Sequence, residues 1–375
     1  MANVLIIGGG FAGLIAAERL SASLDSTHQI TLASPNKKFT FYPALVELAF
    51  GECDVSDITF DLSEKLAALG VRYVKGEVLG INARRRRARV TGDDFDGELV
   101  FDFVIFAMGR RLATEKVGGF FEHSHHLLGT NAAIKFGNAV NKFTEGNIVL
   151  GSCPGGRLPV PPCEAAFVLA NKFEREIAEG IINIKVIFPE SLSKAFGGAD
   201  LHKELESAFA KRKINVLYDV PISEISEIEV ISAEKHRIAH DLLMLIPPFR
   251  GQAILDDLGI TDENDFIKVN DQMQVNGMEN AYAAGDLVAF SGPKFAHMAV
   301  RQAEVAAANL ASELSGKDPK AHYDHEIAAI IDAGGADSIY LHYGIWDESL
   351  YRIRKGAFWS WAKGTHDAIW RARHR

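Results

Sequence analysis

The sequence predicts an α/β fold built on parallel sheets, and three observations lead to that prediction. Short apolar runs alternate with segments of helical periodicity, which is typical of a parallel α/β sheet. The chain contains two strand–glycine–helix starts, one near residue 4 and one near residue 148. Its 375 residues are enough for two or three domains of roughly 100–200 residues each. We therefore expect two Rossmann-like domains and a separate C-terminal segment.

The first unit is expected to begin with a strand, a glycine turn and a helix. Residues 3–7 are apolar and end at glycine, which indicates a buried strand, and 12–24 have the apolar period of a helix. Residues 29–33 indicate the second strand. The same reasoning predicts a helix over 61–69, strands over 71–75 and 103–107, and a hairpin-like meander over 79–102, whose run of four arginines we interpret as a solvated turn.

The second unit is expected to begin with a strand over 147–151. A long proline-rich turn, 153–162, separates that strand from a helix over about 163–178. The remaining predicted elements are strands at 184–188, 216–218, 228–231, 242–246 and 281–283, and a long helix at about 297–314. The domains predicted from this order are 1–108 with 265–325, then 109–264, and finally 326–375.

Composition excludes several classes of protein. Hydrophobic residues make up 47% and charged residues 24%, so a sizeable core is expected rather than disorder. A net charge of −9 argues against nucleic acid as a partner, because phosphate binding needs a basic surface. The three cysteines form neither a disulfide framework nor a metal-ligand spacing, so we expect no metal and a reducing, intracellular location. No apolar run is long enough for a signal-peptide core or a membrane span.

Residues 8–13 form the pattern G-x-G-x-x-G between the first predicted strand and helix. Gly8 permits the tight turn, Gly10 lets the backbone approach a pyrophosphate, and Gly13 lets the helix pack close to the strand. The helix then offers free N–H groups, beginning at Phe11 and Ala12, to the phosphates. The strand and helix context makes this a strong signal for a dinucleotide, against the alternative of a purely structural turn.

An acidic residue is expected at the end of the second strand to hold the ribose of the dinucleotide. Ser34 stands at that position instead. A hydroxyl group also hydrogen-bonds a ribose, although more weakly than a carboxylate does. We therefore assign Ser34 to the cofactor site.

Two further segments resemble markers of two-dinucleotide flavoproteins. Residues 280–286, which end in Gly285-Asp286, resemble the second FAD fingerprint, in which the aspartate accepts hydrogen bonds from the ribityl chain. Residues 103–109, with Ala107 and Gly109, resemble the place where the chain passes between domains. The resemblance implies FAD as cofactor and the glutathione-reductase-like arrangement of FAD and NAD(P)-binding domains.

Within these flavoproteins, the chain resembles the family of sulfide:quinone oxidoreductases, flavocytochrome c sulfide dehydrogenase and type II NADH dehydrogenase. The segments that carry the resemblance to the sulfide:quinone branch are 41–51, 246–251 with its double proline, and 293–302. The last of these is similar to the segment beside the flavin ring and the quinone. The resemblance places Lys294 and His297 near the flavin, where Lys294 would stabilise negative charge on the flavin or the quinone.

The second dinucleotide site departs from an NADH-binding turn. The glycines at 151, 155 and 156 run into a long proline loop before the helix starts, so NADH is the less favoured donor. In the sulfide branch this place carries a redox cysteine, which would be Cys163. The predicted helix N-terminus would lower the pKa of its thiol. Cys153 could be its partner across the loop and Glu164 its proton carrier, the alternatives being small buried cysteines and an ordinary acid of a first helical turn.

The chain also departs from the sulfide branch. Residues 123–140 contain no cysteine, and no cysteine follows Cys163, so the usual polysulfide-bridging pair is absent. Sulfide oxidation would have to proceed through Cys153 and Cys163. The alternatives are a type II NADH:quinone oxidoreductase and a flavin-carrying subunit without its own donor site.

The C-terminal segment is basic and aromatic. From residue 350 onward there are seven Lys and Arg but one acid, and all four tryptophans lie in the last thirty residues. Such a segment suits a lipid interface, although these aromatics could instead cap the core or form a dimer contact. We therefore predict a peripheral enzyme on the cytoplasmic face of a membrane, which passes two electrons from a small sulfur donor through FAD to a membrane quinone.

Overall fold

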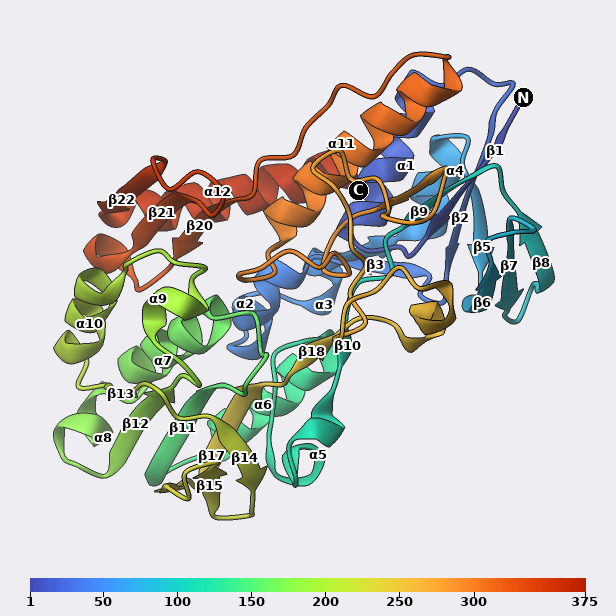
Figure 1. Ribbon diagram of the computed structural model, residues 1–375. Coiled ribbons are helices and arrows are strands. Elements are labelled where there is room, and N and C mark those ends of the chain that lie inside the picture. Colours follow the sequence, from blue (N-terminus) through green and yellow to red (C-terminus); the bar gives the residue numbers. More distant parts are fainter.

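The computed structural model describes residues 1–375 and contains two parallel α/β sheets, one at the upper right and one at the lower left of Figure 1. The first sheet has the order β19-β9-β1-β2-β5, and every pair in it is parallel. Apart from the edge strand β5, its strands are largely apolar and buried, because both faces of the sheet are covered. They span β1 Asn3–Ile7, β2 Gln29–Ser34, β5 Arg72–Lys75, β9 Phe103–Phe106 and β19 Ala281–Ala283.

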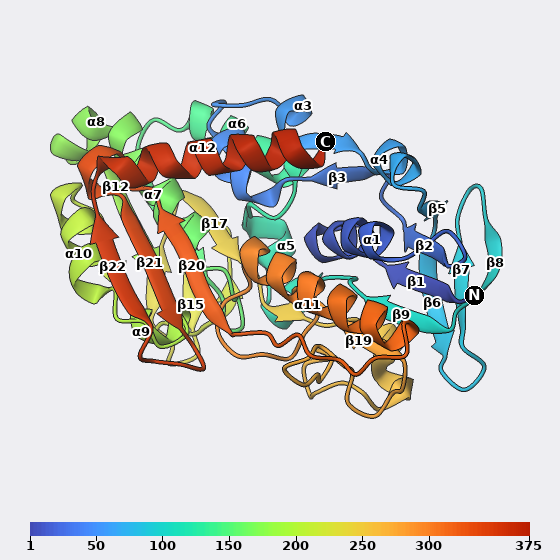
Figure 2. The same ribbon diagram turned by 90° about the horizontal axis from the view of Figure 1, so that it is seen from above.

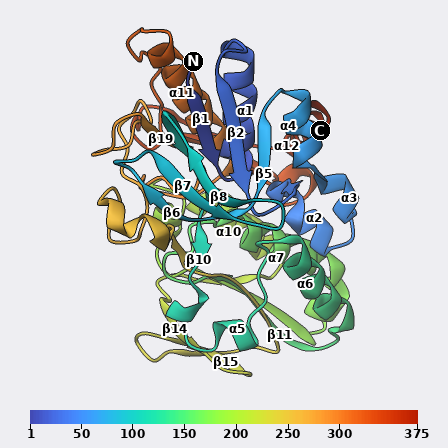
Figure 3. The ribbon, with the colours of Figure 1, turned by 90° about the vertical axis from the view of Figure 1, so that its right-hand side faces the viewer.

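Two helices from distant parts of the sequence cover one face of this sheet. α1 (Phe11–Ser23) and α11 (Ala296–Leu314) pack side by side through alanine-rich surfaces (Figure 2). The meander β6–β7–β8 lies on the other face (Figures 2 and 3). Its antiparallel strands are Glu77–Asn82, Arg87–Thr91 and Asp96–Val100.

The segment between β2 and β5 contains several short elements. They are β3 Lys38–Thr40, the 3-10 helix Tyr42–Ala44, α2 Leu45–Ala49, α3 Val55–Ile58, β4 Thr59–Asp61 and α4 Leu62–Ala68. β3 and β4 pair antiparallel to each other. Asp61 begins α4 by accepting the N–H groups of Ser63 and Glu64.

The second sheet has the order β13-β12-β11-β17 and is also parallel. Alternate residues of β11 face two different cores: Ile148 and Leu150 belong to the main core, and Val149 faces the small core under the β14–β15–β16 sheet. Its strands are β11 Gly146–Ser152, β12 Ile182–Ile187, β13 Asn215–Leu217 and β17 Leu242–Ile246, and the small sheet is β14 Ile222–Ile225, β15 Glu229–Ser232 and β16 Arg237–Ala239.

The helices of the second unit include several that the apolar pattern did not indicate. α6 and α10 are amphipathic helices with a polar outer face, so their apolar positions are spaced too widely to form runs. The predicted helix over 163–178 begins earlier, at Val160, and breaks at Phe173 into two helices. The helices are α5 Phe120–His123, α6 Thr130–Lys142, α7 Val160–Lys172, α8 Glu174–Ala178, α9 Leu192–Ala195 and α10 His202–Lys211.

The chain crosses between the two sheets at a small antiparallel pair. β10 (Arg111–Leu112) leads away from the first sheet and β18 (Phe249–Arg250) leads back to it. This crossing follows residues 103–109, the segment that resembles the place where the chain of two-dinucleotide flavoproteins passes between domains. The loops around it lie beside the carboxyl end of β19, where a ligand site is expected in open α/β sheets.

The C-terminal segment forms a three-stranded antiparallel sheet followed by a long helix. The strands are β20 Glu326–Ile331, β21 Ile339–Gly344 and β22 Tyr351–Lys355, and the helix is α12 Ala357–His374. Figure 2 shows α12 running from the side of α8 and α10 to the side of α3 and α4. No helix combines the length and apolar character that a membrane span requires.

Candidate functional site

The glycine turn joins β1 to α1 through a contact too close for any side chain. A Cβ atom on Gly8 would overlap the carbonyl oxygen of Ala107, and Gly8 has a φ of 112°, which favours glycine. A Cβ atom on Gly13 would overlap the carbonyl oxygen of Gly8. These contacts hold the start of α1 against the ends of β1 and β9.

Gly10 has the opposite environment, because a Cβ atom built there meets no atom within 4 Å. The first bond of α1 runs from the N–H of Leu14 to the carbonyl of Gly10. The amides of Phe11, Ala12 and Gly13 therefore lie ahead of the first helical bond, beside this open space. Open space and free amides fit a pyrophosphate, so the residues present suit FAD.

Ser34 lies beside the glycine turn, as its position after β2 predicts. A Cβ atom on Gly9 would come within 2.9 Å of the Ser34 hydroxyl oxygen. That hydroxyl accepts the amide of Asn36 at 3.3 Å and is buried. Its role toward a ribose stays a prediction.

Asp286 is held by a cation that the sequence analysis did not single out. Its carboxylate forms an ion pair with Arg110, the residue after Gly109. The guanidinium of Arg110 also lies 4.3 Å from the ring centroid of Phe249. Gly285, which precedes the aspartate, donates its N–H to Gln302 on α11 at 2.8 Å. The signal in the sequence was the position of Arg110 directly after the inter-domain marker.

Lys294 is buried a short distance from Asp286. Its ammonium group donates to the carbonyl of Val288 and lies 4.9 Å from the ring centroid of Phe266. Burial, and then the nearby Arg157 guanidinium, hold the pKa of Lys294 well below its ordinary value. Burial in this low-dielectric site therefore disfavours the charged form of Lys294, which is the behaviour of a lysine at a functional site.

Arg157 fixes the proline-rich loop to the first unit. Its Nε donates to the carbonyl of Gly292 at 2.6 Å and its Nη2 donates to the carbonyl of Phe290. The amide of Lys294 donates to the carbonyl of Arg157 at 2.8 Å. Burial lowers the pKa of Arg157 to about 10. Arg157 was missed in the sequence because nothing local distinguishes it from a surface arginine.

His297 lies in the first turn of α11 and faces the C-terminal sheet. Its Nε2 is 3.1 Å from both the carbonyl oxygen of Glu326 and the amide nitrogen of Ala328. Burial lowers its pKa to about 4. The ring nitrogen is therefore used to join α11 to β20, and a cofactor role for His297 stays a prediction.

Cys163 and Cys153 are both buried free thiols, and they lie in different hydrophobic clusters. Cys163 is the fourth residue of α7, one turn inside the helix, and its Sγ is 3.3 Å from the carbonyl of Pro159. Burial raises the pKa of both thiols. The expected lowering of the Cys163 pKa is thus wrong, because complete desolvation of the thiolate outweighs the helix dipole.

Glu164 forms a buried ion pair with Lys363 of α12. The two charged groups are 2.6 Å apart, and Glu164 also accepts the amide of Asp332 at 2.8 Å. Burial raises the pKa of Glu164. Although burial alone would lower the pKa of Lys363, the carboxylate of Glu164 raises it. This pair connects the start of α7 to the C-terminal helix.

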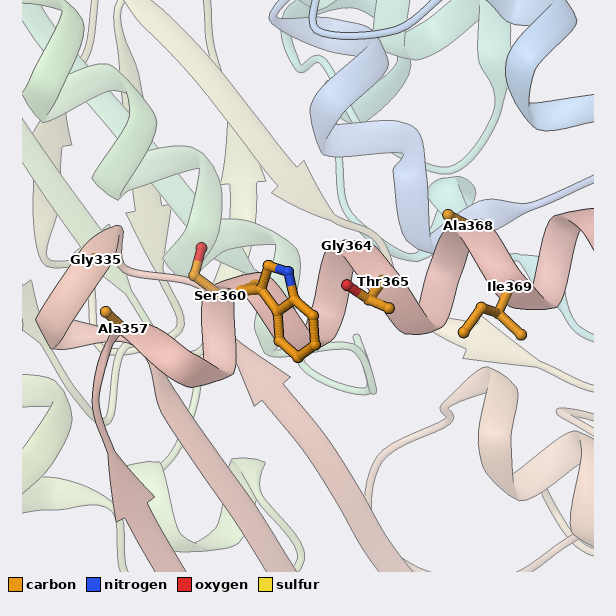
Figure 4. Close-up of a pocket in the computed structure, with 8 residues that line it drawn as sticks. Gly335, Ala357, Ser360, Gly364, Thr365, Ala368 and Ile369 are labelled. Atoms are coloured by element: carbon orange, nitrogen blue, oxygen red, sulfur yellow. The ribbon is translucent and has the colours of Figure 1, made fainter.

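Two tryptophans of α12 are half-buried against aromatic neighbours, and a third is exposed. Trp359 stacks on Tyr340 at 4.3 Å, and Trp370 packs on Phe11. Trp361 stays exposed, with Phe358 and Ile369 on the same helix. An open hollow of about 670 Å³ runs along α12 (Figure 4). Its lining residues are Gly335, Ala357, Ser360, Trp361, Gly364, Thr365, Ala368 and Ile369.

Comparison with known proteins agrees with this arrangement. The model of the pyridine nucleotide-disulphide oxidoreductase family matches residues 2–303. The sulfide-quinone reductase of Aquifex aeolicus is 24% identical over 299 residues, which are 76% of this chain and 68% of that protein. The type II NADH:quinone oxidoreductase of Staphylococcus aureus is 21% identical over 376 residues, or 91% of this chain and 90% of that protein.

A solved structure shows the same fold. The crystal structure of the sulfide:quinone oxidoreductase from Aquifex aeolicus superposes with a TM-score of 0.93 and 20% identity, and the match covers 100% of this chain and 92% of that chain. The predicted fold class, the resemblance stated from the motifs and FAD as the cofactor are therefore confirmed.

Gly10 and Gly13 provide a matched pair of variants. Gly13→Ala should lower the free energy of unfolding of the apoprotein by about 1–3 kcal/mol, because its Cβ atom overlaps backbone. Gly10→Ala should leave apoprotein stability nearly unchanged but reduce bound flavin at least tenfold, because its Cβ atom enters space needed by the pyrophosphate. Chemical denaturation and the ratio of flavin to protein absorbance measure the two effects. Full flavin content in Gly10→Ala would contradict the assignment.

Lys363→Met should destabilise the protein by about 3–5 kcal/mol, because it leaves Glu164 buried without a cation. The pKa of folded Glu164 is raised above its ordinary value of 4.5, so stability falls as pH rises through that folded pKa. The loss should therefore be largest near pH 8 and smaller near pH 5, as measured by denaturation at both values. The control is Lys317→Met, at an exposed lysine. A loss that does not change with pH would count against the buried charge.

Proposed function

The chain belongs to the pyridine nucleotide-disulphide oxidoreductase family, and we propose that it passes two electrons from a small sulfur donor through FAD to a membrane quinone. It is a flavoprotein oxidoreductase similar to sulfide:quinone reductases and to type II NADH:quinone oxidoreductases. The choice of donor within that class is our inference. The following paragraphs give what supports it.

The observation that carries the proposal is the turn between β11 and α7. Residues 153–159 lie between the strand and the helix, and Arg157 fixes this loop to the backbone at 290–292. α7 then begins Val160-Pro161-Pro162, so two of its first three residues lack an N–H group. A helix start without these donors cannot cradle the pyrophosphate of NADH, which favours a small donor.

FAD, when bound, accepts two electrons from a donor and passes them to an acceptor. Gly8, Gly10 and Gly13 shape the turn whose amides would hold its pyrophosphate. Asp286 would exchange its ion pair with Arg110 for hydrogen bonds from the ribityl hydroxyls. Lys294 would lie near the flavin ring, where a proton taken up by its amine would stabilise negative charge on the flavin or the quinone.

Cys163 and Glu164 would serve the sulfur donor. A thiol with a raised pKa needs a base to remove its proton before it reacts. Glu164 is the adjacent residue, and burial raises the pKa of its carboxyl group, so this carboxylate takes up a proton more readily than an exposed one does. Lys363 would stabilise its ionised form. Cys153 would be a second sulfur site in this scheme.

A second candidate is NADH:quinone reduction. Two observations favour it: burial of Cys163, which disfavours the reactive thiolate, and the likeness to the type II enzyme of Staphylococcus aureus over 91% of this chain. If no small donor reduces the flavin, the chain would instead be a flavin-carrying subunit.

The quinone would reach the protein from a membrane surface, on its cytoplasmic face, beside α12 and the segment 293–302. Phe358, Trp361 and Ile369 project apolar groups from α12 into solvent. Exposed cations accompany them on β22 and at the end of the helix. This combination suits peripheral binding to anionic lipid.

Anaerobic titration with sodium sulfide and with NADH tests the donor. Sulfide should bleach the visible flavin absorbance, and Cys163→Ala should abolish that bleaching while Cys53→Ala leaves it unchanged. An equal rate in Cys163→Ala would mean that this cysteine is structural. Bleaching by NADH with sulfide inert would replace the sulfur proposal by the second candidate.

Sedimentation with anionic vesicles tests the membrane surface. Trp361→Asp should reduce vesicle binding roughly tenfold or more, because it removes a large apolar contact and adds a repelled charge. Phe121→Asp is the control, since Phe121 is 85% exposed and lies on α5. If both variants bind as the wild type does, the surface is elsewhere.

A further inference from the structure

The end of α12 packs on the first residue of α1. The ring of Trp370 lies 4.9 Å from that of Phe11, 5.1 Å from Phe41 and 5.4 Å from Phe39, as measured between ring centroids. Phe11 is also 5.1 Å from Phe39. Four aromatic rings from three parts of the chain thus form one cluster.

Polar contacts fasten the same turn of α12. His374 is buried and lies 2.8 Å from a carboxylate oxygen of Glu18 on α1. Lys65 of α4 forms an ion pair with Glu18 at 3.1 Å. Arg375 donates to the carbonyl of Ser56 at 2.9 Å. The end of the chain is therefore fixed to α1, through the contact of His374 with Glu18, and to α3, through Arg375.

Phe11 connects this aromatic cluster to the expected cofactor site. Phe11 is the first residue of α1, so its amide is one of those beside the open space at Gly10. Its side chain is only 9% exposed, because Trp370 and two phenylalanines cover it. Any rotation of Phe11 that opens the turn must therefore disturb the end of α12.

We propose that the end of α12 together with Arg375, residues 370–375, is a latch that holds the glycine turn closed on bound FAD and slows release of the flavin. The matched family model ends at residue 303, so this latch lies outside it. The inference rests on FAD binding. It does not depend on the donor, the quinone or membrane attachment.

Flavin release from the purified holoprotein tests the latch. Free flavin fluoresces more strongly than flavin quenched in a protein, so the rise in fluorescence after dilution gives the release rate. Trp370→Ala should release flavin about tenfold faster, in keeping with the loss of aromatic contacts. The control is Trp361→Ala, at an exposed tryptophan on another side of the same helix, and it should release flavin at the wild-type rate. A wild-type rate in folded Trp370→Ala, or equal acceleration in both variants, would overturn the latch.

A milder variant covers the case in which Trp370→Ala does not fold. His374→Ala removes only the pairing with Glu18 and should accelerate release about threefold. Thermal melting with and without FAD gives a second measurement that is independent of catalysis. The increase in melting temperature produced by FAD should be smaller in both latch variants than in the wild type. An unchanged increase together with an unchanged release rate in His374→Ala would also reject the proposal.

Discussion

The structure depends on the close approach of backbone at Gly8, Gly13 and Ala107. Because no side chain fits between these residues, α1 starts directly at the carboxyl ends of β1 and β9. This contact places the free amides of α1 beside the open space at Gly10. It also sets the position of Phe11, on which the end of the chain packs. The absence of side chains at Gly8 and Gly13 therefore sets the position both of the amides at the start of α1 and of Phe11, on which Trp370 packs.

Around this cradle, buried charges are stabilised by contacts between distant segments. Arg110 pairs with Asp286, and Arg157 satisfies carbonyls of the loop that follows Asp286. Lys294 is held by a carbonyl in the same loop. Each group would be costly to bury alone, so the proline-rich loop and the loop after β19 stabilise each other. These contacts fix both loops beside Asp286.

The helix α12 connects the two α/β units. Lys363 on one part of the helix pairs with Glu164 of α7, and Trp370 with His374 contacts α1 at its end. One helix therefore contacts both units, while Phe358, Trp361 and Ile369 on its exposed side face solvent.

The sequence by itself determined the features that depend on neighbours along the chain. The parallel sheets and the glycine turn follow from apolar runs and from glycine spacing, which act locally, and Asp286 was singled out by the resemblance of residues 280–286 to a flavoprotein fingerprint. Tertiary structure alone decided the environment of Cys163, where burial raises a pKa that the helix start was expected to lower. It also decided the roles of Arg110, Arg157 and Lys363, because an ion pair or a hydrogen bond between residues more than a hundred positions apart leaves no local pattern. The packing of α12 escaped prediction for the same reason: Trp370 contacts Phe11, at the start of α1, and only the folded chain brings the two together.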